Sequence, residues 1–382
     1  MSNLNAGVIG VGFIGAAHVE ALRRLGIKVI ALSGSTEERA KSKAKEMNIP
    51  KAYGDYRQLI NDDEVDVVHI CTPNYLHYSM VKEAIKAEKH VVCEKPLAMN
   101  SKESADLVNL AAKSSKIHAV CYNIRFYPLC LLVREMVREG DLGEIYFVSG
   151  SYLQDWLFFD TDWNWRVLPE LGGDLRAVAD IGTHWLDLIN SITGLDIVKV
   201  FADMKTFIPV RKKPKIEVST FKGKELSFAE HEDYKITTED YATILLEYSN
   251  GGKGVLTVSQ IAAGRKNKLS FEIYGSKKSV AWSSETPNEL WVGHREKSNE
   301  LIIKDPSLLR GESKEYASYP GGHTEGFPDT FKQLFKCVYN AISKGSTDKP
   351  LYATFLDGHR ELLLCEAIKK SAQQSQWVEV GD

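Results

Sequence analysis

The first candidate for chemistry is a lysine at the end of a predicted strand. The run His90 to Cys93 is apolar and rich in valine, which predicts a buried strand. It stops at Glu94, Lys95 and Pro96, because proline has no amide hydrogen and disfavours helix in the residue before it. Open α/β sheets bind ligands at the carboxyl ends of their strands, so Lys95 is a candidate for polarising a substrate oxygen. A surface ion pair between Glu94 and Lys95 is the alternative interpretation.

A carboxylate and an imidazole form the second candidate group. Asp180 and His184 are four residues apart in a segment that predicts a helix continuing to about Ile192, so they share one helical face. Held in this way, they form an oriented acid–base unit. The alternative is a capping aspartate and a histidine packed in the core, and the spacing alone is compatible with both.

A glycine-rich turn predicts a dinucleotide site in the first third of the chain. The segment Gly10-Val11-Gly12-Phe13-Ile14-Gly15 stands between a predicted strand, Ala6 to Ile9, and a predicted helix from Ala16 to about Leu25. Gly10 permits the tight turn, Gly12 lets the backbone approach a pyrophosphate, and Gly15 allows close contact between helix and strand. The pyrophosphate then meets the positive end of the helix. The expected cofactor contacts in this turn are Gly10, Gly12, Phe13, Ile14 and Gly15.

The second predicted strand, Lys28 to Leu32, bears on the choice between NAD and NADP. A site that prefers NAD usually has Asp or Glu here to hold the ribose 2′-hydroxyl. This chain has Ser33 instead, followed by Ser35 and Arg39, which could bind a 2′-phosphate. Arg39 could equally be an exposed residue of the next helix. The cofactor is therefore expected to be NAD or NADP, with a slight preference for NADP.

Strands and helices alternate through the rest of this region, which is typical of a doubly wound sheet. The strand Val65 to Cys71 ends in Thr72 and Asn74, whose hydroxyl and amide groups could lie over the ribose. An ordinary turn with a helix cap explains these residues as well. The remaining predicted elements are a helix from Leu76 to Glu88, the strand His90 to Cys93, a helix from Ser101 to Ser114 and a strand from Ile117 to Tyr122.

The pattern changes after Arg125, so we place a domain boundary near Asn123. A helix is predicted from Pro128 to Glu139, ended by Gly140. Asn250-Gly251 is a hairpin signal and predicts antiparallel neighbours. The β-rich runs are Ile145 to Leu153, Ile197 to Ile208, Tyr241 to Tyr248, Gly254 to Gln260 and Leu269 to Tyr274, and two further helices are predicted at Pro328 to Ser343 and His359 to Ala372.

Length and composition restrict the class of protein. A chain of 382 residues exceeds one typical core and predicts two domains. The net charge of −3 argues against nucleic acid or an acidic membrane surface as a partner, and the basic run Arg211-Lys212-Lys213 is interpreted as a solvated loop. No secretory signal or bilayer-spanning run is visible. The six cysteines have no metal-ligand spacing, which predicts reduced thiols, no metal site and a cytoplasmic protein.

Five motifs, taken together and in order, resemble the Gfo/Idh/MocA oxidoreductase family, which includes glucose-fructose oxidoreductase and inositol dehydrogenase. They are the Gly10–Gly15 turn, Thr72 to Asn74 with His77, Glu94-Lys95-Pro96, Asn123 with Arg125, and Asp180 to His184. The resemblance covers the chain from end to end. It implies a Rossmann domain over residues 1–123 and a second α/β domain over 124–382 with a large open, mainly antiparallel sheet. Relatives bury the open face in dimers or tetramers, so a homodimer or homotetramer is expected.

The resemblance also implies a reaction, hydride transfer between a nicotinamide and a secondary carbinol or ketone of a sugar, polyol or sugar derivative. In this family the matching Asp and His line the cleft opposite the Lys. His184 would then remove the hydroxyl proton, Lys95 would stabilise the oxygen, and Asp180 would orient one of them. Family members share these roles differently, so the division between His184 and Lys95 stays open. His77, Glu94, Asn123 and the pair Trp165-Arg166 are implied cofactor contacts.

Aromatic and polar residues before the Asp180 helix suit a sugar ring, which is apolar on its faces and polar at its edges. Each tryptophan alone could also be a core anchor. His323, flanked by glycines as in relatives, could bind a substrate hydroxyl or be a simple loop histidine. The expected substrate contacts are Lys95, Arg125, Gln154, Trp163, Asp180, His184 and His323.

A non-catalytic nucleotide-binding sensor is the competing function, because fold does not fix function. Some regulators share this fold, including the yeast repressor of galactose metabolism. Such a protein could lose the catalytic set, whereas this chain keeps Lys95, Asp180 and His184. Their retention favours the enzyme. The residues select neither a particular sugar nor a direction of reaction.

Overall fold

Two compact units make up the computed structural model, which describes residues 4–215, 231–345 and 349–381. The first unit comprises residues 1–123, 170–173 and 328–362, and the second comprises 124–169, 174–327 and 363–382. The first unit thus ends its long run at Asn123 and also takes in two later segments that the sequence assigned to the second domain.

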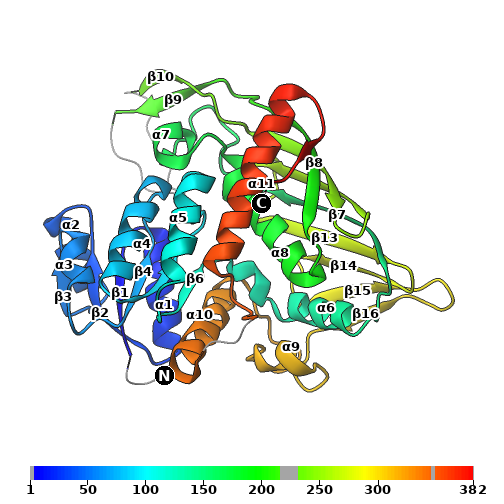
Figure 1. Cartoon of the computed structure of the whole chain (residues 1–382), viewed down its shortest axis with the longest axis horizontal. Helices are drawn as coiled ribbons and strands as arrows, with labels where there is room; N and C mark the ends of the chain where they lie inside the picture. Colours follow the sequence, from blue (N-terminus) through cyan, green and yellow to red (C-terminus); the bar gives the residue numbers. More distant parts are fainter. Residues whose placement is uncertain (1–3, 216–230, 346–348, 382) are drawn as a thin grey trace. The chain divides into compact units, whose positions relative to one another are not determined.

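A six-stranded sheet forms the first unit, in the order β3-β2-β1-β4-β5-β6 with every neighbouring pair parallel (Figure 1). Its strands are β1 (Asn5–Ile9), β2 (Lys28–Ser33), β3 (Lys51–Tyr53), β4 (Val67–Ile70), β5 (His90–Cys93) and β6 (His118–Val120). The order reverses between β1 and β4, and this switch point is where doubly wound sheets bind ligands. The helices are α1 (Phe13–Arg24), α2 (Glu37–Glu46), α3 (Tyr56–Ile60), α4 (His77–Lys86), α5 (Ser101–Ala111) and α10 (Phe327–Lys344).

Continuous apolar runs explain why these strands lie at the centre of the unit. Every residue of β4 is buried, as are Val91 to Cys93 of β5. A parallel sheet that is covered by helices on both faces requires this pattern, since neither face of the strand meets water. The predicted Rossmann architecture is confirmed.

The second unit is built on a nine-stranded sheet in the order β16-β15-β14-β13-β7-β12-β11-β8-β17. All neighbours are antiparallel except β7 and β12, so the predicted open, mainly antiparallel sheet is confirmed. The strands are β7 (Ile145–Leu153), β8 (Ile197–Lys205), β11 (Tyr241–Tyr248), β12 (Lys253–Ser259), β13 (Lys268–Gly275), β14 (Ser279–Ser283), β15 (Glu289–Gly293), β16 (Glu300–Ile303) and β17 (Val378–Glu379). A separate antiparallel pair is formed by β9 (Val210–Pro214) and β10 (His231–Lys235).

One face of this sheet packs against helices and the other is open. Alternate residues of the strands, such as Ile244 and Leu246, join a core with α6 (Pro128–Arg138), α8 (Thr183–Thr193) and the second half of α11 (Phe355–Gln374). Large apolar side chains on the opposite face are partly exposed, namely Phe147, Leu245, Trp291 and Leu301. This alternation follows from the two-residue period of a strand.

Local sequence signals placed most elements within a few residues. The hairpin expected at Asn250-Gly251 joins the antiparallel strands β11 and β12, and Gly251 has a φ of 82°. The helix expected from Asp180 instead begins as a π turn, Val178–Gly182, before α8. The short strands β9, β10 and β14 to β17 were not predicted. In the described part of the chain, no helix is both long and apolar enough to cross a membrane.

Candidate functional site

The glycine turn of the first unit has the geometry of a pyrophosphate cradle. Gly10 has a φ of 111°, and a Cβ added to it would clash with the carbonyl oxygen of Cys71. A Cβ on Gly15 would likewise collide with the carbonyl oxygen of Gly10, so both positions require glycine. At Gly12, by contrast, an added Cβ meets no atom within 4 Å. The backbone there is open to a ligand at the start of α1, next to Phe13, which is 53% exposed.

The residues expected at the adenosine ribose differ in accessibility. The side chain of Ser33 is buried at the end of β2, and its carbonyl accepts the Gly10 amide at 2.9 Å. Ser35 and Arg39 are exposed, with Arg39 in the first turn of α2 beside the capping residue Thr36. Ser35 and Arg39, the two residues predicted to bind a 2′-phosphate, are accessible, while Ser33 supports the turn through its backbone.

His77 has a structural place in the first unit. It is fully buried, and its ring nitrogens lie 2.7 Å from the carbonyl oxygen of Pro96 and 2.9 Å from that of Thr72. Burial lowers the pKa of His77 although both carbonyls favour protonation. A neutral ring donates to one carbonyl only, and the shorter distance favours Pro96. His77 therefore connects two ligand-facing turns, and this geometry does not support a direct contact with the cofactor.

Two other predicted cofactor contacts are also occupied by protein groups. Asn74 donates from Nδ2 to the carbonyl of Gly172 at 2.8 Å. Asn123 is 1% exposed and donates to the Thr330 hydroxyl at 2.7 Å. Asn123 therefore fastens the end of β6 to α10, and its amide is directed into the protein rather than towards a ligand.

The Glu94-Lys95-Pro96 turn separates its two charged side chains. Glu94 is buried, with Oε1 lying 3.0 Å from His18 Nε2, whereas Lys95 is half-buried. Burial tends to raise the pKa of the Glu94 carboxyl, but the hydrogen bond from His18 and the charges of His18 and Lys95 lower that pKa to about 2. Glu94 is therefore an anion that faces the interior, and its expected direct contact with the cofactor is not supported. Within this motif Lys95 therefore remains the candidate for chemistry.

In the second unit, Asp180 is held at both carboxylate oxygens. Arg166 donates from Nε to Oδ1 at 3.1 Å, and Gln260 donates from Nε2 to Oδ2 at 2.8 Å. The Arg166 guanidinium lies 4.4 Å from the centre of the Trp165 ring, a cation–π arrangement that fixes its plane. Asp180 is therefore oriented by two partners, and Gln260 is a site residue that the sequence analysis missed.

His184 lies about one turn further along, in the first turn of α8, and is 8% exposed. Its ring centre is 6.2 Å from that of Tyr152 on β7. Burial raises the pKa of Tyr152, and the negative charge of Asp180 raises it further. Tyr152 is thus a common neighbour of Asp180 and His184. The position of Tyr152 among the alternating buried residues of β7 was the sequence signal that could have identified it.

Buried charges support this part of the second unit. Glu239 accepts the backbone amides of Arg176 at 3.0 Å and Val178 at 2.8 Å, immediately before the π turn that carries Asp180. Burial raises the pKa of Glu239, and the amide bonds oppose this shift. The next residue, Asp240, accepts hydrogen bonds from two fully buried guanidinium groups, those of Arg176 and Arg211.

Arg211 contradicts the interpretation of its basic run as a solvated loop. It is fully buried and donates to the carbonyls of Leu157 at 2.8 Å, Phe159 at 2.7 Å and Asp162 at 3.2 Å. It therefore holds the loop that precedes Trp163. Short-range sequence context gave no sign of this role, because the partners are about 50 residues away.

The predicted substrate contacts outside the Asp180 helix have different environments. Gln154 donates to Asn267 and accepts from the Trp156 indole, both at 2.7 Å. Trp163 packs edge-to-face against Tyr234 at 5.3 Å. His323 is exposed, with Nδ1 3.2 Å from the carbonyl of Gly321.

Arg125 is not placed as a substrate ligand. It is 6% exposed and forms a bidentate pair with Asp187, from Nε at 2.7 Å and from Nη2 at 2.5 Å. Asp187 is 2% exposed. The sequence did not reveal this pair, because Asp187 lies on α8, 62 residues further along the chain, where no local pattern indicates the pairing.

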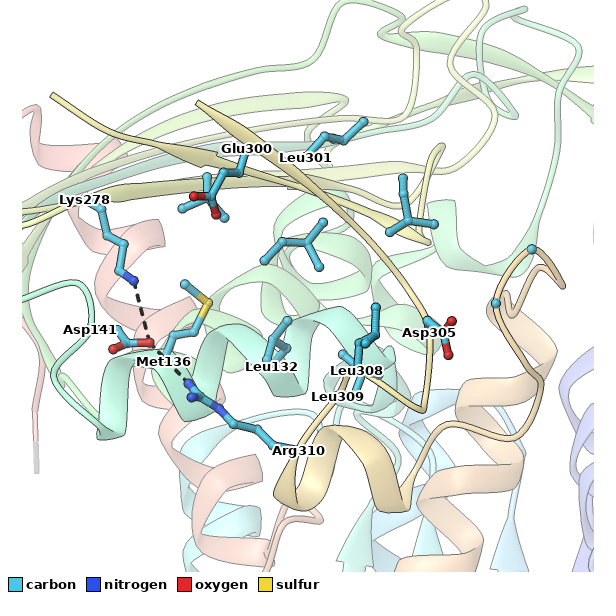
Figure 2. A pocket seen from close by; sticks show the side chains of 15 residues that line it. Leu132, Met136, Asp141, Lys278, Glu300, Leu301, Asp305, Leu308, Leu309 and Arg310 are labelled. Atoms are coloured by element: carbon cyan, nitrogen blue, oxygen red, sulfur yellow. Dashed lines mark hydrogen bonds and ion pairs between the residues drawn. The ribbon is translucent and has the colours of Figure 1, made fainter. Parts of the chain in front are cut away.

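A separate hollow of about 650 Å³ lies in the second unit beside β16, α6 and α9 (Gly311–Glu315). Figure 2 shows its apolar floor, which includes Leu132 and Met136 of α6. At its edge Asp141 pairs with Arg310 at 3.2 Å and with Lys278 at 3.7 Å. None of the predicted site residues lines this hollow, so it has no part in the proposed chemistry.

Comparison with known proteins agrees with this combination of domains. Residues 4–122 match the family model described as "Oxidoreductase family, NAD-binding Rossmann fold", and residues 130–281 match that of the "GFO/IDH/MocA C-terminal domain". The protein is thus a two-domain NAD-binding oxidoreductase. More particularly, it belongs to the Gfo/Idh/MocA family.

Several relatives cover the whole chain. Levoglucosan dehydrogenase of Pseudarthrobacter phenanthrenivorans is 29% identical over all of this chain and 99% of its own length. Myo-inositol 2-dehydrogenase of Thermotoga maritima is 25% identical over 99% of both chains. Among solved structures, levoglucosan dehydrogenase in complex with NADH and levoglucosan has a TM-score of 0.89 at 27% identity, covering both chains completely. An oxidoreductase domain protein from Kribbella flavida has the same TM-score at 30% identity and the same coverage.

Proposed function

We propose that this protein transfers a hydride between NAD(P) and a secondary carbinol or ketone of a sugar, polyol or sugar derivative. The observation that carries the proposal is the arrangement around Asp180. Both oxygens of its carboxylate are held, and it shares the neighbour Tyr152 with His184. An aspartate that only caps a helix accepts a hydrogen bond from a backbone amide. It does not need two side-chain donors that fix the plane of its carboxylate.

The proposed roles follow from the chemistry of each group. His184 accepts the hydroxyl proton as the hydride leaves the same carbon, and Asp180 orients the acid–base unit. Lys95, at the end of β5, hydrogen-bonds the substrate oxygen and stabilises its developing charge. The proposal requires the Lys95 ammonium and the His184 imidazole to reach one reacting carbon.

The glycine turn would hold the cofactor. The open backbone at Gly12 and the start of α1 fit a pyrophosphate, and a bound nicotinamide would supply the hydride acceptor. For the ribose we propose a slight preference for NADP, because β2 ends in Ser33 rather than an acid and Arg39 is exposed nearby. The levoglucosan dehydrogenase structures hold NADH, so NAD is the competing outcome.

The substrate class is inferred from relatives and from the aromatic loop. Levoglucosan dehydrogenase has been solved with levoglucosan and with L-sorbose, and a second relative is a myo-inositol 2-dehydrogenase. The segment before Asp180 contains Trp156, Trp163 and Gln154, residue types that suit the apolar faces and polar edges of a sugar ring. A cyclic sugar or polyol with a free secondary hydroxyl fits these groups.

The oligomeric state and the cellular compartment of the protein are also inferred. The partly exposed apolar face of the nine-stranded sheet supports a homodimer or homotetramer. A monomer in light scattering at micromolar concentration would contradict this. The six cysteines are free thiols, which supports a cytoplasmic protein.

The decisive experiment measures nicotinamide absorbance with NAD and NADP against a panel of sugars and polyols, including levoglucosan and myo-inositol. Turnover is expected with at least one compound, and Lys95→Ala should reduce kcat by at least about 100-fold with little change in cofactor affinity. Tight binding of NADH or NADPH without turnover on any compound would instead identify a nucleotide sensor. Equal turnover in the Lys95→Ala variant would refute the role of Lys95.

A further inference from the structure

Three amide side chains lie next to the ends of neighbouring strands in the nine-stranded sheet. Because β7 is parallel to β12 and antiparallel to β13, the ends of β7 and β12 and the start of β13 meet at one end of the sheet. Gln154 follows β7, Gln260 follows β12 and Asn267 precedes β13. Gln260 donates from Nε2 to Asp180 at 2.8 Å, so this end of the sheet adjoins the candidate acid–base unit.

The strand register shows which face of the sheet carries Asn267. Tyr152 and Leu269 are paired across β7 and β13, and both are buried in the core that includes α8. Asn267 is two residues from Leu269, and residues two apart in an extended segment share a face. Gln154 is related to Tyr152 in the same way. The ring centre of Tyr152 is 6.2 Å from that of His184, so Asn267 lies on the face of the sheet that His184 covers.

A chain of hydrogen bonds ends at the Asn267 side chain. The indole nitrogen of Trp156 lies 2.7 Å from Gln154 Oε1. Gln154 Nε2 lies 2.7 Å from Asn267 Oδ1, and the Tyr152 hydroxyl lies at the same distance from that oxygen. The backbone carbonyl of Asn267 accepts from the Ser284 hydroxyl at 2.8 Å. Both the main chain and the side chain of Asn267 are therefore held in place.

The Trp156 indole fixes the orientation of both amides. An indole N–H only donates, so the Gln154 atom that faces it is the oxygen. The other branch of the Gln154 amide is an NH₂ group, which also only donates. The Asn267 atom that faces this group must therefore be the oxygen, and that oxygen also accepts from the Tyr152 hydroxyl. The NH₂ group of Asn267 is consequently the branch that faces neither Gln154 nor Tyr152.

The NH₂ group of Asn267 has two donors that the protein does not use. Among the residues that the structure describes, none accepts a hydrogen bond from Asn267 Nδ2. The amide of Gln260 differs, because its Nε2 is bonded to Asp180. Asn267 is half-buried, and its Nδ2 is not fully enclosed by protein atoms. A donor of fixed orientation is thus accessible beside the acid–base unit, as ligand sites require of their few polar groups.

We propose that Asn267 is a substrate-binding residue, whose NH₂ group donates a hydrogen bond to an oxygen of the sugar or polyol other than the reacting one. The proposal rests on the proposed dehydrogenase function, in which Lys95 and His184 act on the reacting oxygen. Because an NH₂ group only donates, the substrate must present an acceptor at this position. A hydroxyl, ether or carbonyl oxygen meets this requirement, whereas a methylene or an ammonium group does not.

Neutron diffraction gives a test that does not depend on turnover. Crystals of the full chain that have been exchanged into D₂O show which branch of each amide carries deuterium. The deuterons of Gln154 are expected on the branch that faces Asn267, and those of Asn267 on the branch that faces neither Gln154 nor Tyr152. The opposite orientation of the Asn267 amide would overturn the proposal whether or not the protein turns over a sugar.

Substrate analogues that each lack one oxygen test the contact itself. For the best compound in the panel of sugars and polyols, kcat/KM is measured after each non-reacting oxygen in turn has been removed. One analogue should lose about 10- to 100-fold in the wild type, because the Asn267 donor is then left without its acceptor. The same analogue should lose less than about threefold in Asn267→Ala. Equal losses in both enzymes for every analogue would show that Asn267 does not bind the substrate.

Asn267→Asp gives a readout that a packing defect would not produce. One carboxylate oxygen still accepts from Gln154 and Tyr152, while the other replaces the donor by an acceptor. An analogue with a protonated nitrogen in place of the identified oxygen should be at least about tenfold poorer than its parent for the wild type, and better than its parent for Asn267→Asp. Asn250→Asp, in the hairpin at the other end of β12, makes the same chemical change and should keep the wild-type preference. An unchanged preference in Asn267→Asp would refute the proposal.

Two further measurements cover the remaining outcomes. If no compound turns over, the dehydrogenase function fails, and calorimetric titration of the NADH complex with the same compounds decides the role of Asn267. Absence of binding, or binding that Asn267→Asp does not change, would then refute that role. If Asn267→Asp does not fold, Trp156→Phe removes only the donor that orients Gln154, and discrimination against the identified analogue should fall at least about threefold. Unchanged discrimination in Trp156→Phe would contradict the proposed chain of donors.

Discussion

The pair Arg125–Asp187 allows a direct test between a substrate contact and a structural ion pair. The two side chains are 6% and 2% exposed and are joined by two hydrogen bonds of 2.7 and 2.5 Å. Truncating one partner of such a buried pair typically costs about 3–5 kcal/mol, because the other charge stays buried without its counter-ion. Replacing both by apolar residues of similar size is often nearly neutral.

We therefore expect Asp187→Leu to lose about 3–5 kcal/mol of unfolding free energy in urea, and Arg125→Met to lose a comparable amount. The double variant Arg125→Met/Asp187→Leu should recover most of this loss, and its kcat/KM should be close to that of the wild type. Urea unfolding followed by tryptophan fluorescence, with steady-state kinetics on the same preparations, measures both quantities. A double variant that is stable but has a KM for the sugar raised more than about tenfold would show that Arg125 binds substrate after all.

Four further outcomes follow from the geometry. Gln260→Leu removes one of the two donors to Asp180 and should lower kcat about 10- to 100-fold without changing NADH affinity, whereas Gln260→Glu, which places a second carboxylate beside Asp180, should be worse in kcat than Leu. Arg39→Ala should raise the KM for NADP at least about fivefold and leave the KM for NAD unchanged, and equal effects on both would remove Arg39 from the 2′-phosphate site. Burial lowers the pKa of His118 to about 4, so the folded state favours its neutral form. The stability that depends on neutral His118 is fully present above pH 6.5 and is lost as the pH falls towards 4. The melting temperature of His118→Phe should therefore depend less on pH in that interval than the melting temperature of the wild type. Gly10→Ala should abolish NADH binding in fluorescence titration, whereas Gly26→Ala, at another positive-φ glycine that lies in the turn after α1, should destabilise the fold while leaving affinity unchanged.

Much of the first unit could be predicted because its signals are local. Each strand is a short apolar run, each turn carries its glycine or proline, and the strand His90–Cys93 was placed without error. In the second unit the short strands were harder to predict from the sequence. β14, β15 and β16 have four or five residues each, and their half-buried alternation is too brief to separate from loops.

The candidate site divides in the same way between local and long-range information. The glycine turn and the pair Asp180/His184 are recognisable from spacing, since the relevant atoms lie within one or two turns of each other. Residues such as Arg125, His77 and Asn123 were assigned by resemblance, but their partners come from distant parts of the chain. Sequence spacing identifies which polar residues lie at strand ends. It does not show which of them are already bonded to other protein groups.

The buried charges behind Asp180 explain how a loop can serve as part of an oriented site. Glu239 holds two amides at the entry to the π turn, while the adjacent Asp240 holds Arg211, which binds three carbonyls of the loop before Trp163. Two consecutive carboxylates thus connect the aromatic loop and the acid–base helix through the backbone itself. Because each carboxylate is paired and buried, moving the loop would expose or separate charges at a cost of several kcal/mol. The loop and the helix should therefore behave as one rigid element of the second unit, which under the proposed function would hold a sugar in a fixed orientation relative to His184.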